Sequence, residues 1–259
     1  MTNKKSLVIE KIFNLCKEKN NYVFDNTLVK DIAKEVGFGN PFDVTKLDNT
    51  QKFPEILLKN DYFIIHLGGG KHKFVKGINK GFHKFESINS KNIFDWKYRQ
   101  SILNEYDTSE SNILSVGFNQ RIIHDFLYDD IVANPKMYGS RRTKTSLNYF
   151  IGKEKIDASN LQMEIDLTTE YNGLVTIFEG KNNFPENFAV YQLYFPFLYY
   201  YNLQKNNELD IKQINCCYLL RKKENGKSII RIYLYTFENP LDMTSIKLVK
   251  NAQYNLIKR

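Results

Sequence analysis

The spacing of hydrophobic residues predicts two helices at the start of the chain. Between residues 6 and 19, apolar side chains recur every three or four positions, as they do on one face of an α-helix. Asn26 or Thr27 can cap a second helix that runs to about Val36. Gly37 follows, and a glycine just past the last helical residue commonly ends a helix.

The pattern then changes from helix to strand. Residues 42–60 have the pattern of a third helical region, which Pro54 interrupts. Residues 61–67 and 71–76 predict two strands that are joined through Gly68-Gly69-Gly70. We therefore expect three helices followed by a glycine-turned hairpin.

The clearest strand pattern lies further along, in the segment LQMEIDLTTEYNGLVTIFEGKN at residues 161–182. It predicts two strands joined at Asn172-Gly173, a dipeptide that tolerates the positive φ angles of a tight hairpin turn. Apolar residues occupy most of the intervening positions, so one face of this hairpin is expected to be buried.

Four ionisable side chains fall on one face of the same hairpin. With the turn centred as above, Asp166 lies opposite Glu179, and Glu164 lies opposite Lys181. Three carboxylates are costly to bury unpaired, but they suit a divalent metal ion. A lysine beside such an ion can orient or deprotonate a water. The alternative is a surface hairpin with two cross-strand ion pairs.

Further elements are expected before this hairpin. Residues 79–108, around Trp96, are polar and irregular, which predicts a linker plus an entry helix. A capped helix is expected from about Thr108 through Ile131. Residues 137–146 are rich in basic side chains and predict a flexible loop.

After the hairpin, a helix is expected to begin near Pro185. The aromatic run Tyr191–Tyr201 is expected to lie mainly in the core. Two further strands, at residues 214–221 and 229–237, flank a turn at Asn225-Gly226 and would complete a mixed sheet.

Composition and charge narrow the class of partner. The 259 residues include 37 Lys and Arg against 29 Asp and Glu, a formal net charge of +8. That balance favours polyanionic partners, although a Lys-rich soluble surface has the same composition. Cys16, Cys216 and Cys217 lack metal-ligand spacing and are interpreted as core thiols in a reducing compartment. No targeting or membrane-spanning segment is evident, so a soluble, cytoplasmic protein is expected.

The hairpin residues resemble a nuclease signature. Asp166 followed by Glu179-Gly180-Lys181 is similar to the D…(D/E)xK motif of the PD-(D/E)xK nuclease superfamily, although Ile165 stands where the motif has proline. The resemblance implies a Mg²⁺-dependent phosphodiesterase core. Asp166 and Glu179 would then be metal ligands, and Lys181 would position the attacking water.

The same resemblance suggests roles for two neighbours. Glu110, on the helix before the hairpin, is a candidate third metal ligand, and the alternative is a first-turn glutamate favoured by the helix dipole. Gln192, on the helix after the hairpin, would contact the metal-bound phosphate or brace Lys181. The motif gives no role to Glu164.

The N-terminal pattern resembles a winged helix-turn-helix over about residues 6–78. In that fold the third helix enters the major groove and the wing touches the DNA backbone. The basic loop upstream of the hairpin is expected to contact DNA as well. The expected contacts are Thr45, Lys46, Asn49 and Gln51 in the third helix, Lys71, His72 and Lys73 in the wing, and Arg141, Arg142 and Lys144 in the loop. The alternatives are a protein-binding winged helix and merely solvated basic segments.

These features together predict an α/β (α+β) protein of two domains. Residues 1–80 would form a winged-helix DNA-binding domain, and residues 81–259 a PD-(D/E)xK nuclease domain with a mixed central sheet flanked by helices. The combination most resembles a type II restriction endonuclease, which implies Mg²⁺-dependent hydrolysis of double-stranded DNA at a short sequence. The alternatives are a non-enzymatic winged-helix regulator with a degenerate nuclease fold, and a DNA-repair or modification-dependent nuclease.

The expected assembly is a homodimer, because one site cuts one strand at a time. The aromatic surface around Tyr194 to Tyr201 is the candidate contact between chains, and the alternative is a monomer that nicks each strand in turn. No GxxxxGK[ST] motif occurs, so no nucleotide cofactor is expected, and no membrane partner is expected either.

Overall fold

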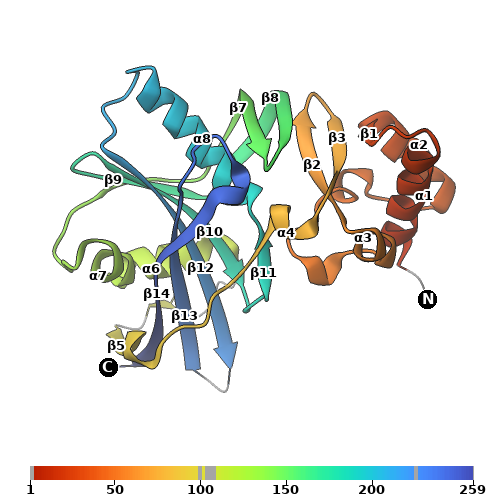
Figure 1. Ribbon diagram of the computed structural model, residues 1–259. Coiled ribbons are helices and arrows are strands. Elements are labelled where there is room, and N and C mark those ends of the chain that lie inside the picture. Colours follow the sequence, from red (N-terminus) through yellow and green to blue (C-terminus); the bar gives the residue numbers. More distant parts are fainter. Residues whose placement is uncertain (1–2, 99–100, 103–108, 225–226, 259) are drawn as a thin grey trace.

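The chain folds into two units that lie side by side (Figure 1). A computed structural model describes residues 3–98, 101–102, 109–224 and 227–258. The smaller, N-terminal unit combines helices with a three-stranded sheet, and the larger unit is built on a seven-stranded mixed sheet. The fold is therefore mixed α and β, as the sequence predicts. Within the described ranges, no helix is long and apolar enough to cross a membrane.

The first two helices of the N-terminal unit lie where the hydrophobic pattern places them. The unit contains α1 (Lys4–Glu18), β1 (Val23–Asp25), α2 (Asn26–Val36), α3 (Glu55–Asn60), β2 (Tyr62–Gly68) and β3 (Lys71–Lys76), with the strands in the order β1-β3-β2. The side chain of Asp25 caps α2 by accepting a hydrogen bond from the Leu28 amide at 2.9 Å. Gly37 ends the helix in the left-handed region, at φ 71°.

The third helix is largely absent, and that prediction is wrong. Two short 3₁₀ turns, Pro41–Asp43 and Thr50–Lys52, take the place of its first part, and only α3 after Pro54 is α-helical. Val44 and Leu47, between the two turns, are buried in the core. The segment is also tied to the larger unit, because the Thr50 amide donates to the Asn187 side chain at 2.8 Å.

The seven-stranded sheet contains the predicted hairpin. Its order is β5 (Ile93–Tyr98), β14 (Ile246–Lys258), β13 (Lys227–Phe237), β12 (Gln213–Glu224), β10 (Leu174–Asn182), β9 (Leu167–Tyr171) and β6 (Lys136–Tyr138). In the hairpin, β9 lies next to the edge strand β6, and β10 lies next to the central strand β12. β10 is parallel to β12, β5 is parallel to β14, and the other neighbours are antiparallel. β12 and β13 confirm the two predicted strands, and their turn at Asn225-Gly226 lies outside the described residues. β5 contains Trp96, so this part of the expected linker is an edge strand.

Helices cover both faces of this sheet. α6 (Glu110–Asn119) and α7 (Ile122–Tyr128) pack on one face, and α8 (Tyr191–Lys205) packs on the other. Adjacent cysteines show the alternation, because Cys216 points into the core under α8 and Cys217 into the core under α6. The single helix expected from Thr108 breaks at Arg121, which has a φ of 63°. Thr108 itself lies outside the described residues.

The expected flexible loop at residues 137–146 is instead mostly strand. β7 (Arg141–Ile151) and β8 (Glu154–Ile165) form a separate two-stranded antiparallel ribbon, which we call the β7–β8 ribbon. It packs on α8 and lies beside β2. The remaining elements are α4 (Ile78–Gly81), β4 (Phe82–Lys84), the 3₁₀ turns Ser90–Asn92 and Met243–Ser245, and β11 (Asn187–Ala189), which pairs with β4. The helix expected near Pro185 begins only at Tyr191.

Candidate active site

Asp166 and Glu179 meet where β9 and β10 begin to separate. The hairpin register is as predicted up to the pair Leu167 and Phe178. Asp166, one residue further, sits in a bend between β8 and β9. It accepts a hydrogen bond from the Gly180 amide at 3.2 Å, which holds its carboxylate beside β10.

Lys181 joins two carboxylates from different elements. Its ammonium lies 3.0 Å from Glu179 Oε1 and 2.8 Å from Glu110 Oε2. Ser109 caps α6, so Glu110 is the first helical residue and projects at the end of β10. Gly180 permits this approach, because a methyl group there would lie 3.1 Å from the Glu110 backbone oxygen. Sequence reasoning named Glu110 as a candidate, and the structure brings it into the cluster.

Gln192 also belongs to the cluster, but it contacts Glu179 rather than Lys181. Its amide nitrogen donates to Glu179 Oε1 at 2.8 Å. The hydroxyl of Tyr218 donates to the other end of the same amide at 3.3 Å, which fixes its orientation. Sequence reasoning missed Tyr218. What connects it with the cluster is its position directly beside Glu179 on the parallel strand β12.

Burial controls the protonation of this cluster. Burial raises the pKa of Glu179 to about 8, although the neighbouring Lys181 opposes the shift. Burial also raises the pKa of Asp166, against the Gly180 hydrogen bond and Lys181. For Lys181, burial disfavours the charged form, but the Glu179 and Glu110 carboxylates outweigh it and raise the lysine pKa. In the metal-free protein, Lys181 is therefore a protonated donor.

The oxygen atoms of this cluster are the kind of ligand that a hard divalent cation prefers. Asp166, Glu179 and Glu110 offer carboxylate oxygens, which Mg²⁺ prefers, and the buried Glu179 is the group that gains most from a nearby positive charge. Across the described ranges, however, no three His, Cys, Asp or Glu side chains are already arranged to hold a metal. The ammonium of Lys181 occupies the position between Glu179 and Glu110. The residues fit Mg²⁺ by type, and the two glutamates would have to turn from Lys181 to bind it.

Glu164 does not face Lys181, so that prediction is wrong. The chain leaves the β9–β10 sheet at Asp166, and Glu164 pairs with Arg142 on β7 instead. Its carboxylate lies 3.2 Å from the Arg142 guanidinium, and both side chains are exposed. Glu164 remains near the cluster, because its charge contributes to the raised pKa of Asp166.

The predicted base-contacting residues of the N-terminal unit do not share a helix. Thr45 is buried, and it lies with Lys46 and Asn49 between the two 3₁₀ turns. The side-chain oxygen of Asn49 is also buried, with no hydrogen-bond partner in the part of the chain that the structure describes. Lys46 and Gln51 are exposed. A recognition helix built from these residues is therefore ruled out.

Of the three predicted wing contacts, Lys71, His72 and Lys73, only Lys71 is free to face a phosphate in the part of the chain that the structure describes. His72 is buried and hydrogen-bonds to Asn26 and His66, and burial lowers its pKa to about 4, so it is neutral at pH 7. Lys73 is held 2.5 Å from Glu154 on β8. Lys71 is exposed at the turn. The predicted phosphate contact by His72 is wrong because its ring packs inside the hairpin.

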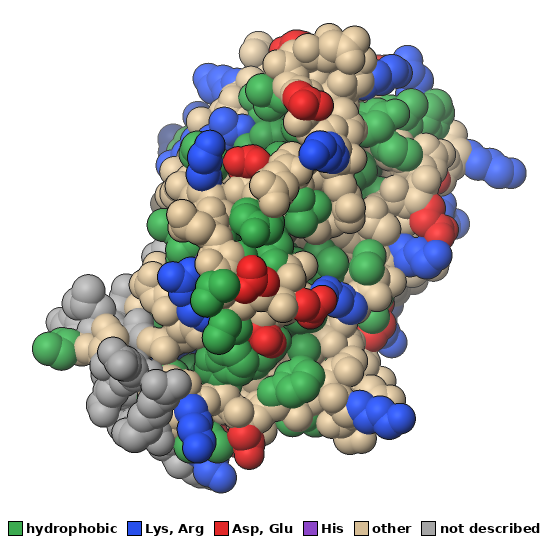
Figure 2. All heavy atoms as spheres, turned by 90° about the vertical axis from the view of Figure 1, so that its left-hand side faces the viewer, with side chains coloured by type: hydrophobic (Ala, Val, Ile, Leu, Met, Phe, Trp, Pro, Cys, Tyr) green, Lys and Arg blue, Asp and Glu red, His purple; other side chains and the backbone are tan. Residues whose placement is uncertain are grey.

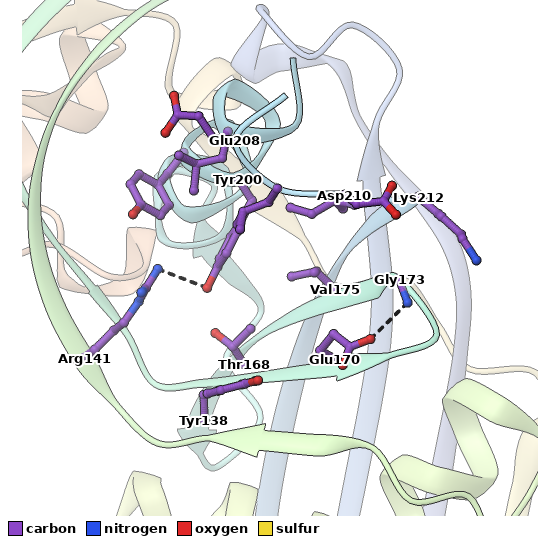
Figure 3. A pocket seen from close by; sticks show the side chains of 14 residues that line it. Tyr138, Arg141, Thr168, Glu170, Gly173, Val175, Tyr200, Glu208, Asp210 and Lys212 are labelled. Atoms are coloured by element: carbon purple, nitrogen blue, oxygen red, sulfur yellow. Dashed lines mark hydrogen bonds between the residues drawn. The ribbon is translucent and has the colours of Figure 1, made fainter. Parts of the chain in front are cut away.

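Arg141 lines a cavity of about 750 Å³ that is separate from the Asp166 cluster (Figure 3). Its guanidinium donates to the Tyr200 hydroxyl at 3.0 Å and lies over the rings of Tyr199 and Tyr200. Glu170 and Asp210 also line this cavity. Arg141 is exposed but is engaged by Tyr199 and Tyr200, whereas Arg142 and Lys144 lie on the outward face of the ribbon.

Comparisons with known families place the chain in a family without an assigned activity. The chain belongs to the family described as domain of unknown function (DUF6997), whose model matches residues 77–255. A second model, domain of unknown function (DUF6996), matches residues 5–74. The two matches meet where β3 ends and α4 begins. Comparisons with curated proteins and with solved structures found no match.

Proposed function

We propose that this protein is a Mg²⁺-dependent endonuclease that cuts double-stranded DNA at a short sequence, as type II restriction enzymes do. The observation that carries the proposal is the cluster of Asp166, Glu179 and Lys181, the residues of the D…(D/E)xK motif: Lys181 pairs with Glu179, and Asp166 accepts a hydrogen bond from the Gly180 amide between them. Glu110 and Gln192 extend the cluster from the two helices that flank the sheet. A surface hairpin with two simple ion pairs would not bury Glu179.

Each side chain has a chemical part in this proposal. Asp166 and Glu179, with Glu110 as a third candidate, would hold Mg²⁺, which would supply Lewis-acid polarisation of a phosphoryl oxygen. Lys181 carries a proton and can orient a water or a phosphate oxygen through hydrogen bonds. Glu179, whose pKa is about 8 in the metal-free protein, would bind Mg²⁺ as the carboxylate, so metal binding would release its proton. Gln192 fixes the Glu179 carboxylate.

The charge distribution limits where DNA would lie. Figure 2 shows the face around α7 and the β9–β10 turn, where acidic side chains gather near the middle among apolar patches and basic ones lie scattered around them. That face does not offer a continuous basic surface for a phosphate backbone. The exposed Lys71, Arg142 and Lys144 lie on the β2–β3 hairpin and the neighbouring β7–β8 ribbon, which favours binding there.

The proposed assembly on DNA is a homodimer, but its contact surface is not the aromatic run. Most side chains from Tyr194 to Tyr200 are buried within their own chain, which confirms their expected place in the core. The homodimer itself stays a prediction. From Tyr194 to Tyr201 only Tyr199 and Tyr201 are half-buried, so α8 offers little aromatic surface to a second chain.

A non-enzymatic DNA-binding regulator is the second candidate. One specific observation favours it, because Lys181 already contacts both Glu179 and Glu110 without any metal. In that case the cluster would be a structural ion network, and DNA binding would need no divalent ion.

Cleavage of supercoiled plasmid in Mg²⁺ separates the two candidates. The wild type should produce nicked and linear DNA, and Asp166→Asn, Glu179→Gln and Lys181→Met should each lower the rate by about 100-fold or more. Binding of the same DNA should persist in all three variants, because the lost groups serve the metal and the water. Glu238→Gln and Lys247→Met form the matched control, since these residues make an exposed Lys–Glu ion pair of the same chemistry elsewhere.

Two outcomes would contradict the nuclease proposal. Wild-type protein that binds plasmid but leaves it intact in Mg²⁺ and in Mn²⁺ supports the regulator. Cleavage at the wild-type rate by any of the three cluster variants removes that residue from the site.

A further inference from the structure

The β7–β8 ribbon has one face in the core and one face in solvent. Inward positions such as Leu147, Tyr149, Met163 and Ile165 are buried. The alternating outward positions at the end nearest Asp166 are exposed and polar, and they are Arg142, Lys144, Gln162 and Glu164. The sequence pattern thus produces a strip of hydrogen-bonding side chains on a ribbon whose other face is packed in the core.

These four side chains form two cross-strand rows. Arg142 is directly opposite Glu164, and Lys144 is directly opposite Gln162. The first row is joined by the ion pair described above, which pre-positions the guanidinium. In the part of the chain that the structure describes, the side chains of Lys144 and Gln162 have no hydrogen-bond or ion-pair partner, so their polar ends are available to a ligand.

The strip is fixed in position relative to the Asp166 cluster. β8 ends at Ile165, and Asp166 is the next residue along the chain. Glu164 and Asp166 are two residues apart and interact electrostatically, so this end of the ribbon lies next to the cluster. A ligand that lies along the ribbon would be held at a constant offset from Asp166.

We propose that the outward face of the β7–β8 ribbon recognises DNA sequence in the major groove. Arg142, Lys144, Gln162 and Glu164 are then the specificity-determining residues. This inference rests on the proposed function only in taking DNA as the ligand. A two-stranded ribbon fits the major groove, where Arg and Lys pair with guanine, Gln with adenine and Glu with cytosine.

The geometry also limits the length of sequence that is read. Successive rows are roughly 6.8 Å apart, or two residues of strand, and base pairs are about 3.4 Å apart, so two rows span two base-pair steps, or about three base pairs. Beyond these rows, the register shifts between Thr145 and Leu147, and such a bulge bends a strand pair. The rest of the ribbon is therefore directed away from the same stretch of groove.

Selection from a randomised duplex library tests the inference without requiring cleavage. Wild-type protein is incubated with the library in EDTA, and the bound duplexes are sequenced. The wild type should enrich a short motif. Gln162→Ala should lose about 10- to 100-fold of its preference at one or two positions of that motif while its affinity for random duplex stays the same.

Arg142→Lys separates base reading from phosphate binding. It keeps the positive charge but loses the bidentate fork, so it should relax a different position of the motif without weakening binding overall. Lys155→Ala is the matched control, because this exposed lysine lies on the outward face at the far end of β8. All these side chains are exposed, and unchanged thermal unfolding of each variant verifies its fold.

The selection and the plasmid assay together distinguish failure of the ribbon proposal from failure of the nuclease proposal. No enriched motif, a motif that both variants leave unchanged, or equal weakening on every sequence would overturn the ribbon as the reading element. Because the selection measures binding alone, a motif that shifts in the variants supports the ribbon even if plasmid stays uncut. Conversely, plasmid cleavage with an unchanged motif supports the nuclease and rejects the ribbon.

Discussion

At the scale of single residues, the protonation of Glu179 has a measurable consequence for stability. Its pKa rises from the usual 4.5 to about 8 in the folded protein. The folded state therefore binds this proton more tightly than the unfolded state does. The resulting stabilisation is complete below about pH 4.5, falls as the pH rises, and is lost above about pH 8.

Glu179→Gln should remove this pH dependence, because a glutamine does not ionise. Between about pH 5 and pH 8, the free energy of unfolding of the wild type should fall relative to that of the variant, by at most about 1.4 kcal/mol per pH unit. Urea unfolding of both proteins at several pH values measures the difference. Parallel pH profiles for the two proteins would show that Glu179 is ionised in the fold throughout, against the raised pKa.

The residues that sequence analysis correctly placed close together are those whose positions depend on local geometry. Glu179 and Lys181 are two residues apart on one strand, and the turn at Asn172-Gly173 sets the register that brings Asp166 close. Glu164 was misplaced because the chain leaves the sheet at Asp166, which alternation alone does not reveal. Tyr218 was missed because its position depends on the parallel pairing of β10 with β12.

At the scale of elements, two of the wrong assignments, the basic loop and the third helix, have different causes. The start of β7 is a strand with an exposed polar face, and its basic composition resembles that of a loop because so few of its first residues are apolar. The residue pattern of the segment between Pro41 and Pro54 predicts a helix. Its buried Val44 and its hydrogen bond from Thr50 to Asn187 instead fix it as short turns against the larger unit.

The contact between β2 and β8 is another feature that composition does not reveal. A glycine at position 68 makes this close contact possible. Gly68 has a φ of 76°, and a methyl group on it would lie 2.0 Å from the Ser159 backbone oxygen. Gly69 also has a positive φ, 56°, but the nearest atom to a methyl group there is 3.9 Å away. An alanine at either position would be strained by the positive φ. Only an alanine at position 68 would also clash with Ser159.

Gly68→Ala should destabilise the protein more than Gly69→Ala does. Both variants introduce left-handed strain of about 1–2 kcal/mol, and the clash with Ser159 should add about 1–3 kcal/mol to Gly68→Ala alone. Urea unfolding gives both values, and limited proteolysis near residue 77 should show faster cleavage of Gly68→Ala. Equal free energies for the two variants would mean that β2 and β8 are not in close contact.

At the scale of the whole molecule, the hairpin that sequence analysis treated as a free wing lies against the β7–β8 ribbon. The boundary near residue 77 shows in the sequence as a change of pattern, and the two family matches also divide there. The docking of the two units depends on pairs far apart in the chain, such as Lys73 with Glu154 and His66 with Tyr191. No local pattern encodes such pairs.

This docking predicts different roles in DNA binding for two lysines of one hairpin. Lys71 is exposed beside the ribbon, so Lys71→Ala should reduce the slope of log K against log salt by about 1, as expected when one phosphate contact is lost. Lys73 is already paired with Glu154, so Lys73→Ala should leave the slope unchanged and lower the free energy of unfolding slightly.

Fluorescence anisotropy with a labelled duplex, titrated across a range of salt concentrations, measures both slopes. Lys247→Ala is the control for loss of one positive charge far from the hairpin. Equal reductions for Lys71→Ala and Lys73→Ala would mean that both lysines face phosphate, and that the Lys73–Glu154 pair opens when DNA binds. Unchanged slopes for both would place the DNA backbone away from this hairpin, and the ribbon would then approach the groove without support from the N-terminal unit.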